Sequence, residues 1–273
     1  METLHLFDEF PESNQEITAE RRHQKRMRLE PLIFDILKKN YQEPLEIFYN
    51  YYRFPLDQNK CVVLVERRIH ENLYFLLRNI AYFARGWSLC IVCSDVNLAY
   101  CKECAGSAMV DTITFLPLFT GNPSPEQGKI DYNSLLQDSE FYRKFTAEHL
   151  LFMEVDSYLR KKIPDDILQY DFVAAPYEWD TELAGGGLSF RKKSAMIDIC
   201  ERKKDKLPGQ DIYICQGVHE FGYKMPEFME GITYIAESCM YEDPVAVHQW
   251  WTFFCPQDEE ADFFFKCMIT FDL

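Results

Sequence analysis

Two carboxylates follow an apolar stretch in "LLFMEVDSYLR", residues 150–160. In an extended segment, residues two apart point to the same side, so Glu154 and Asp156 can both contact one bound object. Magnesium and manganese ions prefer oxygen ligands and are often held by one or two carboxylates together with substrate phosphates. The pattern therefore predicts a Mn²⁺ or Mg²⁺ site at Glu154 and Asp156.

The spacing of these two acids is a weak signal by itself. With 44 acidic residues among 273 positions, about seven acid-x-acid pairs are expected by chance. The position of the pair at the end of an apolar run is more informative, because ligands of open α/β sheets bind beyond the carboxyl ends of the strands. Glu66 and Ser94 also end apolar runs, so we expect all these strand ends to face a single cleft.

A strand–helix–strand pattern precedes the acid pair. "CVVLVE" (61–66) and "WSLCIVCS" (87–94) are typical of buried strands, and "ENLYFLLRNIAYFA" (71–84) has the periodicity of an amphipathic helix. Such βαβ units form parallel sheets covered by helices. Further strands are predicted at 112–118, 149–155 and 170–176, with one or two helices at 132–147. The fold class is therefore α/β, with a Rossmann-like, mainly parallel central sheet flanked by helices.

Residues 1–60 predict a helical extension that packs on the main domain, residues 61–273. Apolar residues recur at helical spacing between Leu29 and Leu37, and Pro44 and Pro55 are expected to interrupt the helix. Within this segment, "RRHQKRMR" (21–28) holds five basic residues. It either contacts a phosphate-bearing surface or forms a solvated helix face, which is the commoner arrangement.

Charge and hydropathy exclude several classes of function. The 29 basic and 44 acidic residues give a net charge of −15, which disfavours non-specific binding to nucleic acid or anionic membranes. The sequence contains no run of about 18 apolar residues, so no membrane span is predicted. The first residues lack the pattern of a secretory signal, so a cytoplasmic location is expected.

Ten cysteines are expected to be reduced thiols, because no export signal is seen. The spacing of Cys90, Cys93, Cys101 and Cys104 includes two C-x-x-C pairs, which leaves zinc as an alternative. Cys90 lies within an apolar run, however, where a free cysteine behaves as a small hydrophobic residue.

Three consecutive glycines occur in "ELAGGGLSFRKKSAM", residues 182–196. Glycine permits a close approach that side chains prevent, and a flexible turn is an equally open interpretation. The segment matches neither the P-loop nor the dinucleotide-binding pattern. The helix that follows is expected to be capped by Ser194.

Four motifs in order, "LLFMEVDS", "YDFVAAPYEWD", "GGGLSFRKKSAM" and "VAVHQWW", resemble the GT-A superfamily of nucleotide-sugar glycosyltransferases. The resemblance extends over roughly residues 61–255 and is greatest to a subfamily found in bacteria and large DNA viruses. It implies a GT-A-like fold and the metal-dependent transfer of a sugar from a nucleotide-sugar donor, expected to be a UDP-sugar, to a hydroxyl group of a glycan acceptor. A viral protein of this kind would act in the host cytoplasm.

The resemblance also implies roles for individual residues. Glu154, Asp156 and His248 would bind Mn²⁺ or Mg²⁺. Asp211 would be the catalytic base of an inverting enzyme, with Glu237 as the second candidate, whereas a retaining enzyme requires no such base. The residues implied to bind the nucleotide sugar are Glu66, Arg67, Arg68, Glu154, Asp156, Ser157, Gly186 and Gly187.

Two departures from the family pattern leave an alternative open. Glu154 stands where aspartate is usual, and Gln210 replaces an acid beside Asp211. A catalytically inactive GT-A-like module that binds nucleotide sugar or glycan therefore remains the second hypothesis, and only an assay of turnover separates the two. Outside the resemblance, His248 is equally well explained as a packed histidine, and Trp250 and Trp251 are more commonly core residues than sugar-stacking platforms.

Overall fold

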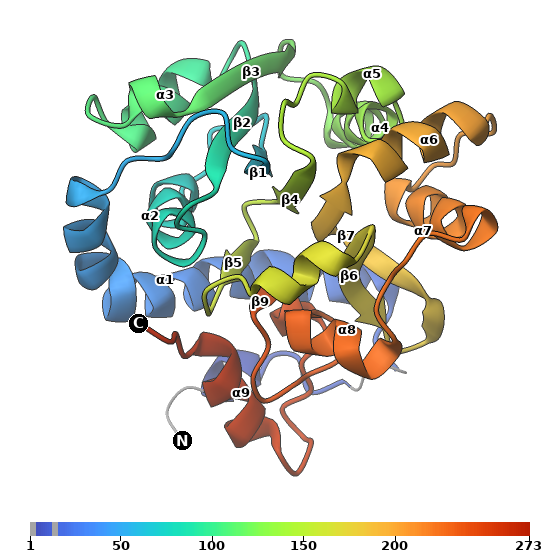
Figure 1. Ribbon diagram of the computed structural model, residues 1–273. Coiled ribbons are helices and arrows are strands. Elements are labelled where there is room, and N and C mark those ends of the chain that lie inside the picture. Colours follow the sequence, from blue (N-terminus) through green and yellow to red (C-terminus); the bar gives the residue numbers. More distant parts are fainter. Residues whose placement is uncertain (1–3, 13–15) are drawn as a thin grey trace.

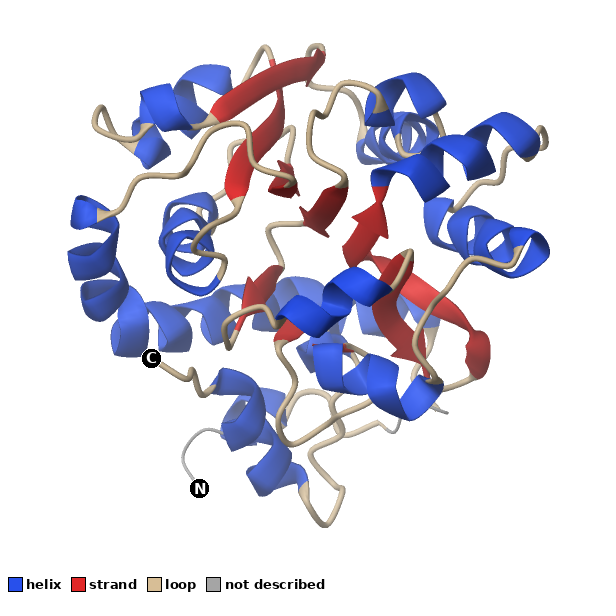
Figure 2. Cartoon of the chain, in the orientation of Figure 1, coloured by secondary structure: helices blue, strands red, loops and turns tan. Residues whose placement is uncertain are grey.

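A six-stranded sheet runs through the middle of the protein, with helices on both faces (Figures 1 and 2). The computed structural model describes residues 4–12 and 16–273. The strand order is β3-β2-β1-β4-β7-β6, and β7 is antiparallel to both of its neighbours while the other pairs are parallel. The α/β class and the mainly parallel sheet are thus confirmed. The strands are β1 (Lys60–Val65), β2 (Ser88–Ser94), β3 (Thr114–Phe119), β4 (His149–Met153), β6 (Phe172–Tyr177) and β7 (Asp180–Lys192).

The central strands are buried on both faces because helices cover each side. From the second residue onward, β1, β2 and β4 are buried throughout, which explains why their sequences are nearly continuous apolar runs. Continuous runs of this kind mark strands that have no solvent-facing side. The predicted strands therefore agree with the structure to within about two residues at each end.

Two layers of helices cover the sheet. Helices α1 (Ala19–Tyr51), α2 (Leu73–Phe83) and α3 (Leu98–Ala105) contribute to the core on one face. Helices α5 (Ser139–Tyr142), α6 (Lys193–Arg202) and α7 (Gln210–Phe221) contribute to the core on the other, with α4 (Pro125–Leu135) beside them (Figure 1). The segment predicted as one or two helices at 132–147 forms α4 and α5, and α4 begins earlier, where the Ser124 hydroxyl accepts from the amide of Gln127.

The predicted interruption at Pro44 is wrong, because α1 continues through both of its internal prolines to Tyr51. A proline inside a helix removes one backbone hydrogen bond and normally bends or ends the helix. Here the side chains of Leu37, Leu45 and Tyr49 are buried on both sides of Pro44. Their packing against the domain offsets the lost bond, as tertiary contacts commonly do for helices in proteins.

A second, three-stranded sheet lies beside the end of β4. It consists of β5 (Ser157–Leu159), β9 (Ala246–His248) and β8 (Ile235–Ala236), in that order. Strand β9 is antiparallel to β5 and parallel to β8. The short turn between β4 and β5 therefore joins the two sheets, and α8 (Phe228–Tyr234) and α9 (Ala261–Ile269) complete the chain around the small sheet.

The glycine segment is part of strand β7, so the alternative of a flexible turn is wrong. Pairing between β6 and β7 passes from Ala174 with Ser189 to Ala175 with Gly185, which leaves residues 186–188 as a bulge. Bulges of this kind bend a strand and redirect its residues. The Ser194 cap is also wrong, because α6 begins at Lys193 and the Ser194 hydroxyl donates to Glu148 instead.

The tryptophans and cysteines belong mainly to the core. Trp250 and Trp251 are fully buried, and the indole nitrogen of Trp250 donates to the Tyr158 hydroxyl at 2.8 Å, which confirms the interpretation as core residues. All ten cysteines are free thiols. Within residues 4–12 and 16–273, no helix is both long and apolar enough to cross a membrane.

Candidate metal and nucleotide site

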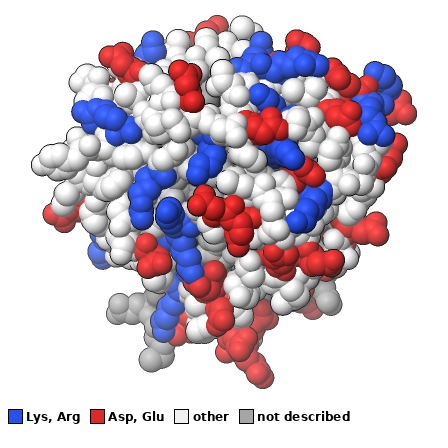
Figure 3. Space-filling view, viewed as in Figure 1, with Lys and Arg blue, Asp and Glu red and all other residues white. Residues whose placement is uncertain are grey.

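A cavity of about 810 Å³ opens at the carboxyl ends of β1 and β4. The order of the strands reverses between these two, and α/β sheets bind ligands at such switch points. Figure 3 shows acidic side chains near the middle of this face, bordered by basic ones. Ten of the eleven residues predicted for the site line the cavity, and these are Glu66, Arg67, Arg68, Glu154, Asp156, Gly186, Gly187, Asp211, Glu237 and His248.

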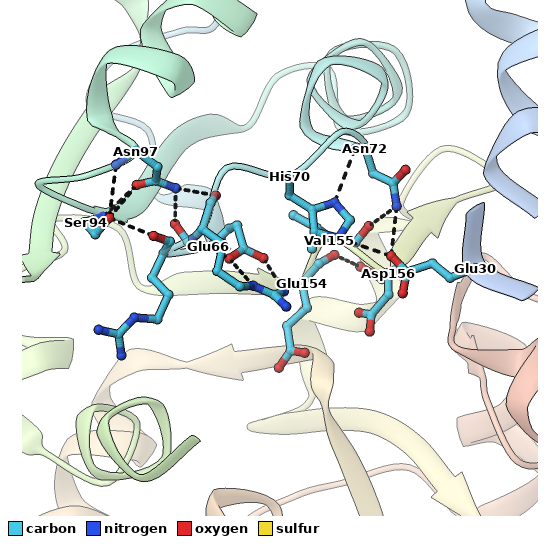
Figure 4. A network of polar contacts seen from close by, with 12 residues as sticks. Glu30, Glu66, His70, Asn72, Ser94, Asn97, Glu154, Val155 and Asp156 are labelled. Atoms are coloured by element: carbon cyan, nitrogen blue, oxygen red, sulfur yellow. Dashed lines mark hydrogen bonds and ion pairs between the residues drawn. The ribbon is translucent and has the colours of Figure 1, made fainter. Parts of the chain in front are cut away.

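The acid pair lies in a turn, so the prediction of an extended segment is wrong. Strand β4 ends at Met153, and Ser157 closes the turn by donating its amide (3.2 Å) and hydroxyl (2.6 Å) to the carbonyl of Glu154. The two carboxylates nevertheless project to the same side (Figure 4). Ser157 is buried and does not line the cavity, so it positions the turn, and its predicted contact with a nucleotide stays a prediction.

The small sheet brings His248 and Glu237 to this turn. Antiparallel pairing places His248, the last residue of β9, opposite Ser157 and hence beside Asp156. Parallel pairing of Ala236 with Val247 places the next residues, Glu237 and His248, side by side. The register of three short strands thus assembles residues that lie about 90 positions apart in the sequence.

One carboxylate oxygen each from Glu154 and Asp156 and one ring nitrogen of His248 lie within 4.8 Å of one another, and the described residues contain no other such group. His248 Nε2 is 3.4 Å from Asp156 Oδ1, and its Nδ1 is 3.1 Å from Glu237 Oε2. Two carboxylates and one imidazole could together hold a divalent cation, with Glu237 orienting the imidazole from behind. The cysteines named as a zinc alternative form no group of this kind in the described chain.

Burial and mutual contact shift the protonation of this cluster. Burial and the charge of Asp156 raise the pKa of Glu154. Burial would also raise the pKa of Asp156, but His248 and Arg26 outweigh it and hold that pKa well below its usual value. Burial would lower the pKa of His248, whereas Glu237 and Asp156 raise it well above normal. The pKa values of these two neighbouring acids thus shift in opposite directions, and Asp156 is the more strongly ionised of the two.

The first helix supplies a residue that the sequence analysis did not assign to the site. Arg26 Nη2 lies 2.5 Å from Asp156 Oδ2, and His23 lines the same cavity. The basic stretch 21–28 contained this signal: the alternative of a solvated helix face is wrong at Lys25, while contact with a phosphate-bearing surface stays a prediction. Lys25 is buried and donates to the Phe254 carbonyl at 2.5 Å, while the exposed Arg28 pairs with Glu9.

Hydrogen bonds within the loop after β1, and from residues at the end of β2 and just after it, hold this loop in place. Glu66 accepts from the Arg68 amide (2.7 Å), Nε (2.9 Å) and Nη2 (2.8 Å). Asn97 donates to the carbonyls of Glu66 (2.9 Å) and Arg68 (2.8 Å), and the Ser94 hydroxyl donates to that of Arg67 (2.7 Å), as Figure 4 shows in part. Ser94 and Asn97 therefore fix the loop, and Arg67 and Arg68 reach the cavity from it.

Each of the three glycines in β7 faces a polar side chain of the site at a distance that leaves no room for a methyl group. A Cβ atom would lie 2.2 Å from Glu237 Oε2 at Gly185, 2.0 Å from Gln210 Nε2 at Gly186 and 2.5 Å from His248 Nε2 at Gly187. The fully buried Arg191 holds the bulge by donating to the Gly186 carbonyl at 3.1 Å. A Cβ atom at any of the three positions would therefore force a side chain of the cluster to move.

Two tyrosines complete the polar wall. The Tyr132 hydroxyl hydrogen-bonds to Glu154, and the Tyr177 hydroxyl donates to Asp211 Oδ2 at 3.2 Å. Asp211 lies in the first turn of α7, while Gln210 beside it accepts from Arg191 at 2.6 Å. Tyr132 was considered from sequence as a substrate contact, with capping and packing as equal alternatives, whereas Tyr177 was given no role, since tyrosines in this aromatic-rich chain carry no distinctive spacing.

The fold and the cavity describe an α/β protein with an acid-and-imidazole cluster at the switch point of its sheet. Residues 124–251 match a family described as a protein of unknown function (DUF5672). No curated protein matches the chain. The matched segment contains Glu154, Asp156, Asp211, Glu237 and His248, whereas the basic residues at 26, 67 and 68 precede it.

Proposed function

We propose that this protein is a metal-dependent glycosyltransferase that moves a sugar from a nucleoside-diphosphate sugar, a UDP-sugar in the first instance, to a hydroxyl group of a glycan. One observation carries the proposal: an acid-and-imidazole cluster and a set of arginines line the same cavity at the switch point of the sheet. A divalent cation with a diphosphate matches both halves of that lining. The resemblance to GT-A enzymes supports the same assignment, with the protein acting in the cytoplasm.

Glu154, Asp156 and His248 would hold Mn²⁺ or Mg²⁺. The ion, when bound, neutralises charge on the departing diphosphate. Arg67 and Arg68 present guanidinium groups from the rigid loop after β1, and such groups pair well with phosphate oxygens. Gly186 and Gly187 line the same cavity, and their bulge makes room for the side chains of Gln210 and His248, beside which the donor sugar would lie.

In an inverting transfer, the acceptor oxygen forms a bond to the anomeric carbon while the bond from that carbon to the phosphate oxygen breaks. The bonding electrons leave with the diphosphate, and a carboxylate takes the proton of the acceptor hydroxyl. Glu237 is already paired with His248, while Asp211 contacts only a tyrosine hydroxyl among the hydrogen bonds described. Asp211 is therefore our choice for the base, ahead of Glu237.

The test is release of nucleotide from a panel of UDP- and GDP-sugars in the presence of manganese. We expect slow donor hydrolysis by the wild-type protein and none by Asp156→Ala. Asp262→Ala serves as the matched control, because that exposed acid lies on α9 and pairs with Lys266. Absence of nucleotide release with every donor and acceptor would contradict the proposal.

A second candidate is a GT-A-like module that binds nucleotide sugar or glycan without turnover. It is favoured by Gln210, an amide hydrogen-bonded to Arg191 where relatives have an acid, and by the pairing of Asp156 with Arg26. UDP binding measured by calorimetry, without nucleotide release in the assay above, would select this candidate.

A further inference from the structure

Arg26 lies next to the candidate metal ligands, and a bound cation would compete with it for Asp156. Its Nη2 atom lies 2.5 Å from Asp156 Oδ2, while the side chain of Asp156 is only 4% exposed. The Nε atom of Arg26 is buried and has no hydrogen-bond partner among the described residues. The guanidinium group is thus drawn to a single carboxylate oxygen and leaves part of its donor capacity unused.

The position of Arg26 is set by a rigid segment of α1. One turn further along the helix, Glu30 accepts from Asn72 Nδ2 at 3.1 Å, and the same amide group donates to the carbonyl of Val155 at 3.3 Å (Figure 4). Lys25 and Leu29, on either side, are buried. The backbone at Arg26 is therefore fixed against the Glu154–Ser157 turn, and its long side chain is the part that can move.

Each carboxylate oxygen of Asp156 faces a neighbouring side chain in the protein as described. Asp156 faces Arg26 through Oδ2 and His248 through Oδ1. A divalent cation bound to Asp156 adds two positive charges at the same place, and like charges that close repel strongly in a buried setting. Binding of a cation therefore favours departure of the guanidinium group from the carboxylate.

The cavity offers the displaced side chain a new partner. The Arg26 side chain is 36% exposed, which leaves it room to change rotamer, and it shares the cavity with Arg67 and His23. Guanidinium groups bind phosphate through two parallel hydrogen bonds, which a single carboxylate oxygen does not offer. A diphosphate that accompanies the metal would use the donors that Arg26 leaves free here.

We propose that Arg26 is an exchangeable counter-ion of this site: it neutralises Asp156 in the ligand-free protein, competes with the metal for that carboxylate, and pairs with a phosphate group once metal and nucleoside diphosphate are bound. The N-terminal helix would then complete the site. This inference rests on the metal site of the proposed function and does not depend on sugar transfer.

The experiment is calorimetric titration of the full chain with MnCl₂ alone, followed by titration with UDP at saturating manganese. Arg26→Gln removes the charge and keeps most of the length. We expect this variant to bind manganese about tenfold more tightly and UDP about tenfold more weakly than the wild type. Arg28→Ala is the matched control, because it removes an exposed arginine of the same helix, and both affinities should remain unchanged.

The outcomes separate this inference from the proposed function. Equal manganese affinity in wild type and Arg26→Gln overturns the exchange and leaves the metal site standing. If the variant binds manganese and the wild type does not, the exchange is supported in its strongest form. If neither protein binds manganese, both the exchange and the metal site are overturned. A charge-retaining variant, Arg26→Lys, should lie between the two in UDP affinity, and thermal unfolding of each variant verifies that it is folded.

Discussion

The ends of two neighbouring parallel strands, β1 and β4, both carry buried acids, yet the two ends differ in how those acids are satisfied. Glu66, after β1, accepts three hydrogen bonds from Arg68, two residues away. Asp156, after β4, faces Arg26 and His248, which come from distant parts of the chain, and its Oδ1 atom makes no hydrogen bond of normal geometry within the described residues. Both acids lie at the ligand-binding edge of the sheet. Only Glu66 has its hydrogen bonds completed by residues of its own loop.

This difference indicates which acid is structural and which is available to a ligand. A carboxylate with its hydrogen bonds provided by the next residues of its own loop stabilises that loop. A carboxylate that depends on exchangeable cations from other elements can accept a metal ion in their place. We therefore expect substitutions at the two strand ends to separate stability from metal binding.

The largest expected effect is on metal binding by Asp156→Asn. Loss of the stronger anion of the cluster should weaken manganese affinity by about 100-fold or more, because the carboxylate charge provides much of the attraction for a hard cation. Calorimetry with MnCl₂ measures this directly. An affinity within threefold of the wild type would remove Asp156 from the ligand set.

Gly187→Ala should weaken manganese binding by about tenfold, since the added Cβ would lie 2.5 Å from His248 Nε2 and displace the imidazole. Gly217→Ala is a matched control: its Cβ would meet Ile199 at 2.4 Å, in the core between α6 and α7. Both substitutions should lower the free energy of unfolding by about 1–3 kcal/mol. Metal affinity should change in the first alone, and an equal loss in both would show that the glycines act through general stability.

Glu66→Gln should give the opposite pattern to Asp156→Asn. The loop after β1 loses its charge-assisted hydrogen bonds to Arg68, which we expect to lower the free energy of unfolding by about 1–2 kcal/mol, a modest value because Arg68 is largely exposed. Manganese affinity should stay within twofold of the wild type. Urea unfolding measures the loss of stability, and calorimetry on the same sample measures manganese affinity. A tenfold loss of metal affinity would show that the two strand ends do not differ in this way.

Lys25→Met should have the smallest effect on metal binding, and it tests a buried charge that bonds to a backbone carbonyl instead of a carboxylate. Burial lowers the pKa of Lys25 from 10.5 to about 8. The cost of charging it is full below pH 8 and disappears as pH rises toward 10.5, because the folded chain then releases its proton before the unfolded chain does. Wild type should thus gain about 2 kcal/mol relative to Lys25→Met between pH 7 and pH 9.5 in chemical unfolding. A pH-independent difference would refute the shifted pKa.

The strand ends were predictable from sequence because buried parallel strands are nearly uninterrupted apolar runs. The apolar segments at 61–66 and 149–155 gave the edge of the sheet and, with it, Glu66, Glu154 and Asp156. Helix α1 was predicted less well, since the effect of Pro44 depends on packing that no local pattern reveals. The same limit applies to the glycines, whose neighbours are set by tertiary contacts.

Partners of the candidate site were the least predictable feature. His248 was placed by its motif, but its proximity to Asp156 follows from the register of three short strands that no periodicity identified. Arg26 was recognised only as one member of a basic stretch, because pairing between residues 130 positions apart leaves no trace in a single sequence. Local patterns therefore predicted where a site lies, whereas the pairing of its charged residues could be seen only in the folded chain.

The contact between Arg26 and Asp156 joins the first helix to the middle of the chain, and His248 adds a residue from near its end. No fragment confined to one part of the sequence holds all three, so this constellation appears only when the chain has folded throughout. A ligand that binds here would stabilise the native state alone, by an amount that grows with the logarithm of its concentration. Cation-dependent protection against unfolding would then serve as a sensor of completed folding.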